Sequence, residues 1–118
     1  MEWSFENRMF AGEGRIGILH LRGFLGDGAL RRVTGAVDWA LSRSQGPLVL
    51  DMTLMSGLSE AGRVAVWQAA HRIAAQHREV VLCGMADLGA DPGPVDELTG
   101  AAVIVHADLT TALAAVSA

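Results

Sequence analysis

The sequence lacks the features of a secreted, membrane-spanning or nucleic-acid-binding protein. Among 118 residues there is one cysteine, Cys83, so no disulfide can form within the chain, and its position in an apolar run predicts a buried, unreactive thiol. Nine basic residues form no cluster and thirteen acidic residues leave a formal charge of −4, which argues against a nucleic-acid partner. The longest aliphatic run, 101–105, is far shorter than the roughly 20 residues of a membrane-spanning helix.

The first residues also lack the positive charges and apolar stretch of a secretion signal. We therefore expect a cytoplasmic protein that does not bind membranes. Hydrophobic residues make up 51% of the chain and charged residues 19%, a composition that favours one folded core over disorder. The length is typical of a single domain, here spanning residues 1–118.

The spacing of apolar residues predicts alternating strands and helices. Trp3, Phe5 and Met9 indicate a first strand, and a glycine-rich turn at 12–14 separates it from a second strand at 16–21, so the two should form a hairpin. An apolar stripe at helical spacing then predicts a helix that ends near 45–47; its members are Leu30, Val33, Val37, Ala40 and Leu41.

The second half of the chain continues the alternation. Short apolar runs predict strands covered on both faces, and proline and glycine mark the loop at 91–94. Asp108 is placed to favour the start of the last helix. Strands are expected at 48–50, 80–83 and 102–105, and helices at 59–77, from about 91–94 and from 109.

This order, β-β-α-β-α-β-α-β-α, predicts an α/β fold with a mostly parallel mixed sheet of about five strands and four helices. Whether the helices cover one face of the sheet or both stays open.

A search for catalytic or metal-binding residues finds no convincing site. The four histidines are dispersed without metal-ligand spacing, and His20 and His71 are interpreted as packed or hydrogen-bonded side chains. Asp51 is expected at the carboxyl end of its strand, where ligands of α/β sheets bind, but spacing assigns it no base or nucleophile. The glycines of 23–28 fit a tight turn better than a phosphate loop. We therefore expect a binding protein that is not an enzyme, with no cofactor and no metal.

One tryptophan has an unusual position. On a helical wheel Trp39 lies opposite Leu30, on the face of Arg32 and Arg43. Exposed tryptophans are enriched at interaction hot spots, although a loop or the first strand would also be able to cover this one.

The segment Leu48-Val49-Leu50-Asp51-Met52-Thr53-Leu54-Met55-Ser56-Gly57-Leu58-Ser59-Glu60-Ala61-Gly62, followed by a helix with Ala69-Ala70-His71-Arg72, resembles the central signature of STAS domains. In bacteria these are best known as anti-sigma factor antagonists. The resemblance extends to Gly23-Phe24-Leu25-Gly26, where the family has a Gly-x-Leu-Asp turn, and to Val95-Asp96-Glu97-Leu98-Thr99-Gly100 and Ala112-Leu113.

The resemblance implies a partner-switching role, in which the domain binds an anti-sigma serine kinase that otherwise holds a sigma factor. In the family the kinase phosphorylates the first serine of an Asp-Ser-Ser-Gly motif. Here the motif reads Ser59-Glu60-Ala61-Gly62, so Glu60 occupies the acceptor position and is not phosphorylatable. The chain then either mimics the phosphorylated form or binds a partner that does not phosphorylate it.

Ser59 is a possible displaced acceptor, but a serine just before a helix is more often its N-cap. The family contacts its kinase through this motif and through the turn, where Gly26 replaces the usual aspartate and Asp27 stands next to it. The resemblance therefore implies a partner-binding surface that comprises Gly26, Asp27, Ser59, Glu60, Ala61, Gly62 and Arg63.

Two alternatives stay open. Some STAS domains are scaffold subunits of larger signalling assemblies, and a small nucleotide-binding α/β domain would use the turn at 23–28 with Asp51. The sequence leaves the oligomeric state undecided.

Overall fold

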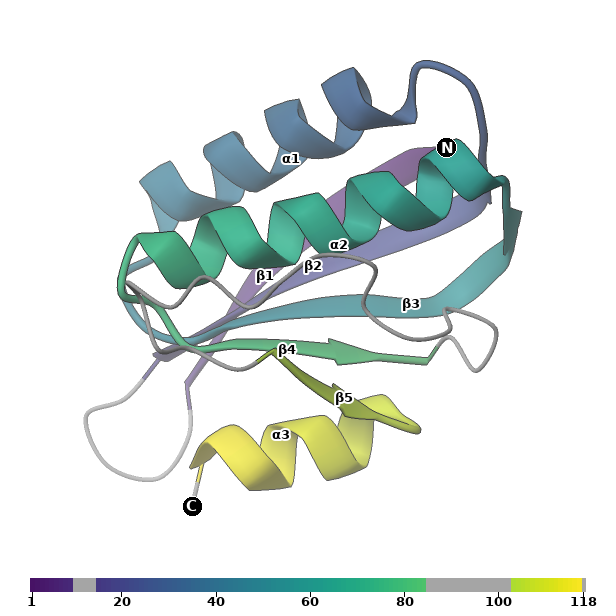
Figure 1. The fold of residues 1–118 in the computed structure, drawn as a ribbon. Coiled ribbons are helices and arrows are strands. Elements are labelled where there is room, and N and C mark those ends of the chain that lie inside the picture. Colours follow the sequence, from purple (N-terminus) through teal and green to yellow (C-terminus); the bar gives the residue numbers. More distant parts are fainter. Residues whose placement is uncertain (10–14, 85–102, 118) are drawn as a thin grey trace.

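A computed structural model describes residues 1–9, 15–84 and 103–117 of the chain (Figure 1). They form five strands and three helices around one mixed sheet. The elements are β1 (Glu2–Met9), β2 (Arg15–Leu25), α1 (Ala29–Arg43), β3 (Leu48–Leu58), α2 (Glu60–Ala75), β4 (Val80–Cys83), β5 (Ile104–His106) and α3 (Leu109–Ser117).

The strands lie in the sheet in their chain order, β1-β2-β3-β4-β5. β1 and β2 pair antiparallel, from Glu2 opposite Arg22 to Met9 opposite Arg15, which confirms the predicted hairpin. The other neighbours pair parallel. Helices α1 and α2 cover one face of the sheet and α3 covers part of the other, so both faces carry helices (Figure 1).

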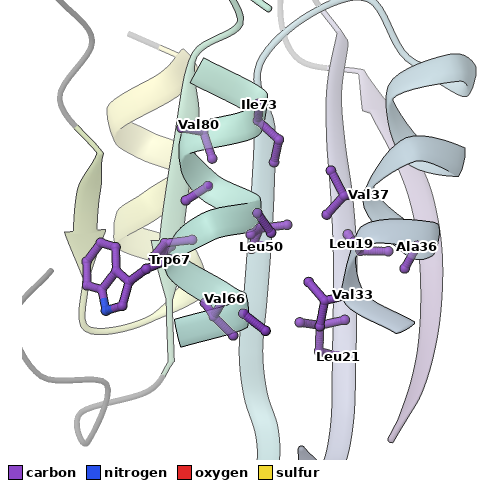
Figure 2. Close-up of a cluster of buried hydrophobic side chains, with 14 of the residues drawn as sticks. Leu19, Leu21, Val33, Ala36, Val37, Leu50, Val66, Trp67, Ile73 and Val80 are labelled. Carbon is purple, nitrogen blue, oxygen red and sulfur yellow. The ribbon is translucent and has the colours of Figure 1, made fainter. Parts of the chain in front are cut away.

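The larger core lies between the sheet and the pair α1 and α2. Figure 2 shows Val33 and Val37 of α1 directed toward β2, and Val66 of α2 directed toward β3. These side chains follow the helical spacing of the sequence, and burying each contributes about 1.5–3 kcal/mol. A smaller cluster under α3 contains Cys83, which is buried as predicted.

Two expectations about the first helix and the central strand are wrong. Leu30, assigned to the buried stripe of α1, is 52% exposed, because it lies beside the face that the helix buries. The residues of that face are Ala29, Val33, Ala36, Val37 and Ala40. Asp51 does not end its strand: β3 continues to Leu58, since its second half pairs with the end of β2 up to Leu25. Asp51 therefore lies inside the strand and not at its carboxyl end, where ligands of α/β sheets bind.

Other boundaries differ by a few residues. The last strand begins at Ile104 instead of 102, and α2 ends at Ala75 instead of 77, with His77 in the left-handed conformation. Asp108 begins α3 as expected, and its carboxylate accepts a hydrogen bond from the Thr111 amide at 2.8 Å. The expected helix at 91–94, the turn at 12–14 and the resemblance at 95–100 lie outside the described residues. Within the described ranges, no helix has the length and apolar character needed to cross a membrane.

Candidate functional site

The predicted site begins at the N-terminus of α2, which Ser59 caps. The Ser59 hydroxyl oxygen accepts a hydrogen bond from the Gly62 amide at 3.1 Å, and the backbone of Ser59 is extended, as an N-cap requires. This confirms the capping interpretation of Ser59. A side chain in this role satisfies one of the amides that the first turn of a helix leaves unpaired.

Glu60 follows the cap and forms an ion pair within the same turn. Its two carboxylate oxygens accept hydrogen bonds from Arg63 at 2.6 and 3.1 Å. The hydrogen bond from Arg63 lowers the pKa of Glu60, and that from Glu60 raises the pKa of Arg63, so both groups are charged at neutral pH. The Glu60 side chain is 74% exposed, which leaves its carboxylate accessible to a partner.

Close backbone packing joins the start of α2 to the end of β2. The Ser59 amide donates a hydrogen bond to the Leu25 carbonyl oxygen at 2.9 Å. A Cβ atom on Gly62 would overlap the same carbonyl oxygen, so only glycine fits without displacing the backbone. Ser59 and Gly62 therefore hold the first turn of α2 against Leu25, the residue directly before the Gly26 turn.

The turn after β2 begins with Gly26, whose carbonyl oxygen accepts a hydrogen bond from the Ala29 amide at 3.0 Å. Asp27 is exposed, and Gly28 has a φ of 79°, a conformation that favours glycine. A hollow of about 540 Å³ separates the first turn of α1 from Ala61 of α2; its lining is Gly28, Ala29, Leu30, Arg31, Arg32 and Ala61. The structure thus brings the turn and the start of α2 to the same end of the domain.

A second group of polar side chains, which the sequence analysis missed, lies on the sheet face opposite α1 and α2. The two ring nitrogens of His20 contact two carboxylates: Nδ1 lies 2.7 Å from Asp51, and Nε2 lies 3.0 Å from Glu6. We call this set, with Thr53, the His20 network.

Asp51 is the buried member of the His20 network. Burial acts to raise its pKa, but hydrogen bonds from the Thr53 hydroxyl and amide, together with that from His20, outweigh burial and lower the pKa. The hydrogen bond from His20 is also the main cause that lowers the pKa of Glu6. Both carboxylates are therefore ionised at neutral pH.

Cys83 donates from its thiol to Asp51 at 3.6 Å, and burial, followed by the nearby Asp51 charge, raises its pKa to about 12. The thiol is therefore protonated and a poor nucleophile, as the sequence predicted. Within residues 1–9, 15–84 and 103–117, no group of three histidine, cysteine or acidic side chains has the arrangement of a metal site.

Strand register, and not spacing along the chain, places the His20 network. His20 lies opposite Asp51 in the parallel β2–β3 pair, and Glu6 lies on β1, two positions from the residue opposite His20. One signal was available: a histidine and an aspartate both interrupt otherwise apolar strands. Pairing them requires the register of two strands that are separated by a helix.

The comparisons with known proteins give structural likeness without sequence matches. No family model and no curated protein matches the chain. The solved structure of the unphosphorylated anti-sigma factor antagonist SpoIIAA is similar, with a TM-score of 0.54 and 15% identity over 97% of this chain and 98% of that one. An uncharacterized protein with a SpoIIAA-like fold from Shewanella loihica PV-4 gives a TM-score of 0.58 and 15% identity over 97% and 93%.

A third structure, Mglu, is similar over 57% of this chain with a TM-score of 0.51 and 22% identity, but the match spans only 17% of Mglu. The SpoIIAA structure and the SpoIIAA-like protein each match over nearly all of both chains with a TM-score above 0.5. The chain therefore has a SpoIIAA-like, STAS-like fold.

Proposed function

We propose that the chain is a protein-binding regulator of the anti-sigma factor antagonist type, and that it binds an anti-sigma serine kinase through the turn at Gly26–Asp27 and the first turn of α2. The observation that carries the proposal is the exposed carboxylate of Glu60 at the capped N-terminus of α2, next to that turn, in a SpoIIAA-like fold. The resemblance of the sequence places the phosphoacceptor serine of the family at this position.

Glu60 either mimics a phosphorylated serine or belongs to a protein whose partner does not phosphorylate it. The pairing of Glu60 with Arg63 supports the second of these mechanisms. A phosphoserine carries a charge of about −1.5 to −2 and three acceptor oxygens. Glu60 has a charge of −1, both of its oxygens are engaged by Arg63, and the pair is neutral in sum. The first turn of α2 therefore has the net charge of an unphosphorylated surface. We infer that the protein binds its partner and that phosphorylation at position 60 cannot end this binding.

Calorimetric titration of the protein with the anti-sigma kinases of its own organism, with and without ATP, tests this proposal. The natural chain should bind one kinase with the same affinity in both conditions. The Glu60→Ser variant should bind without ATP and lose binding as the kinase modifies it. Glu79→Ser, which changes an exposed glutamate beyond the opposite end of α2, is the matched control and should behave like the natural chain.

Binding by the serine variant alone would instead mean that Glu60 mimics the phosphorylated state. If neither protein binds any of the kinases, the partner assignment is wrong. Light scattering over a range of protein concentrations would then test the scaffold alternative, which requires stable self-assembly.

A further inference from the structure

An aromatic surface lies at the outer side of α1, where β1 passes beside it. Trp3 and Trp39 are 37% and 40% exposed, and their rings lie 5.3 Å apart. Phe5 meets Trp39 edge-on at 5.4 Å, and the Arg43 guanidinium lies 5.1 Å from the centre of the Trp39 ring. The first strand thus covers Trp39 only in part, and two tryptophans form one exposed apolar patch.

A hollow of about 300 Å³ opens beside this patch, with Met1, Trp3, Arg31, Arg32, Gly35 and Ala36 around it. Gly35 is exposed in the middle of α1, where glycine weakens a helix. A Cβ atom on Gly35 would meet nothing within 4 Å, so no contact within the chain requires glycine here. The missing side chain keeps the hollow open.

Positive charge surrounds the hollow and the tryptophans. Arg32, Gly35, Trp39 and Arg43 recur at helical spacing and form one stripe along α1, which at 1.5 Å per residue spans about 16 Å. Helix α1 has three arginines and one acidic residue, Asp38, and that residue pairs with Arg72 of α2 at 2.9 Å. This local excess of positive charge contrasts with the formal charge of −4 for the whole chain.

We propose that this surface, the α1–β1 face, binds an acidic protein segment that carries one large apolar side chain. The apolar side chain fits the hollow over Gly35, against Trp3. Carboxylates of the segment would pair with Arg31 and Arg32 at one end of the stripe and with Arg43 at the other, where guanidinium groups bind them in a bidentate geometry. The tryptophans supply the desolvated contact typical of hot spots.

This partner differs from the kinase of the proposed function, because the stripe runs along the outer side of the other helix. Among the described residues, Arg31 and Arg32 alone border both hollows. The tryptophans and arginines would also suit the stacked bases of a single-stranded oligonucleotide. The hollow over Gly35, which fits one large apolar side chain, favours the protein segment.

Fluorescence anisotropy with labelled twelve-residue peptides tests the proposal. The probe carries two glutamates on each side of a single phenylalanine; one matched peptide replaces the glutamates by lysine and another replaces the phenylalanine by serine. The probe should bind at least about tenfold more tightly than either matched peptide, and binding should weaken between 50 and 500 mM salt, since screening acts on its exposed charges.

Three variants locate the binding on the α1–β1 face. Gly35→Leu fills the hollow, and Trp39→Ala and Arg32→Gln remove the apolar and charged contacts; each should weaken probe binding by about tenfold. Gly35→Leu matters most, because the open space at this position lets the variant fold. The control Arg22→Gln changes an exposed arginine of β2 that lies opposite Glu2, on the other face of the sheet from Trp3, and should leave binding unchanged.

Equal binding of the three peptides, or a probe affinity that Gly35→Leu leaves unchanged in a folded variant, would overturn the proposal. So would tighter binding of a single-stranded oligonucleotide than of the probe. A dimer in light scattering that Gly35→Leu dissociates would assign the face to a second copy of the chain and would also overturn it.

Discussion

Removing the Asp51 carboxylate should destabilise the domain more than removing any exposed acid. In Asp51→Ala the His20 ring loses its 2.7 Å partner, and the hydroxyl and amide of Thr53 lose their acceptor. A hydrogen bond to a charged group contributes about 1.5–3 kcal/mol. Asp51 loses three such bonds, but Thr53 is exposed and His20 keeps its contact with Glu6, so we expect a loss of about 3 kcal/mol, well below the sum of the three.

Urea unfolding monitored by circular dichroism measures this difference. With a denaturant slope of about 2 kcal/mol/M, a loss of 3 kcal/mol lowers the midpoint by about 1.5 M. Asp38→Ala is the matched control, since it removes a carboxylate that also contacts a cationic side chain, but an exposed one. Its loss should stay below about 1 kcal/mol. A loss below about 1 kcal/mol for Asp51→Ala as well would refute the interpretation of Asp51 as a buried carboxylate that depends on its hydrogen bonds.

The same variant predicts a pH dependence of definite sign. The folded state lowers the pKa of Asp51, so its carboxylate adds stability above the unfolded value of about 4, and this stability is lost as pH falls through the lower folded value. The difference in unfolding free energy between the natural chain and Asp51→Ala should therefore shrink below about pH 4. A difference that grows with acidification would contradict the assignment of an ionised Asp51.

One labelling reaction and three substitutions test local features. Because burial raises the Cys83 pKa to about 12, the folded protein should resist iodoacetamide at pH 8 and react in denaturant; rapid labelling of the folded state would contradict the buried thiol. Gly62→Ala should lose about 1–3 kcal/mol through overlap with the Leu25 carbonyl, whereas Gly35→Ala, which meets open space, should gain about 0.5–1 kcal/mol; equal effects in urea unfolding would refute the contact. Ser59→Ala should lose about 0.5–2 kcal/mol in calorimetric unfolding, and an unchanged melting midpoint would count against the cap.

The sequence was sufficient for those parts of the fold that depend on local pattern. The alternation of strands and helices, the β1–β2 hairpin, the Ser59 cap and the burial of Cys83 follow from periodicity and from the chemistry of single residues. The extension of β3 to Leu58 was missed, because the polar and glycine residues after Asp51 do not form an apolar run.

Contacts that depend on strand register were beyond the reach of the sequence. Asp51 had no identifiable partner because His20 lies 31 residues away and meets it only through the parallel β2–β3 pairing. The residues of the predicted site were easier to bring together from the sequence, because Ser59, Glu60 and Gly62 are close in the chain. Leu25, which they contact, directly precedes the predicted turn. The pairing of Glu60 with Arg63 is also local, three residues apart on a helix, and was predictable in principle from that spacing.

Strand β1 connects the His20 network with the α1–β1 face. One side of β1 gives Glu6 to the His20 network, and the other gives Trp3 and Phe5 to the contact with Trp39. Because β1 is an edge strand with one neighbour, its position depends on its pairing with β2 and on these side-chain contacts. Loss of the His20 network should therefore loosen the α1–β1 face, whereas the start of α2, held by the Leu25 carbonyl of β2, depends on it less.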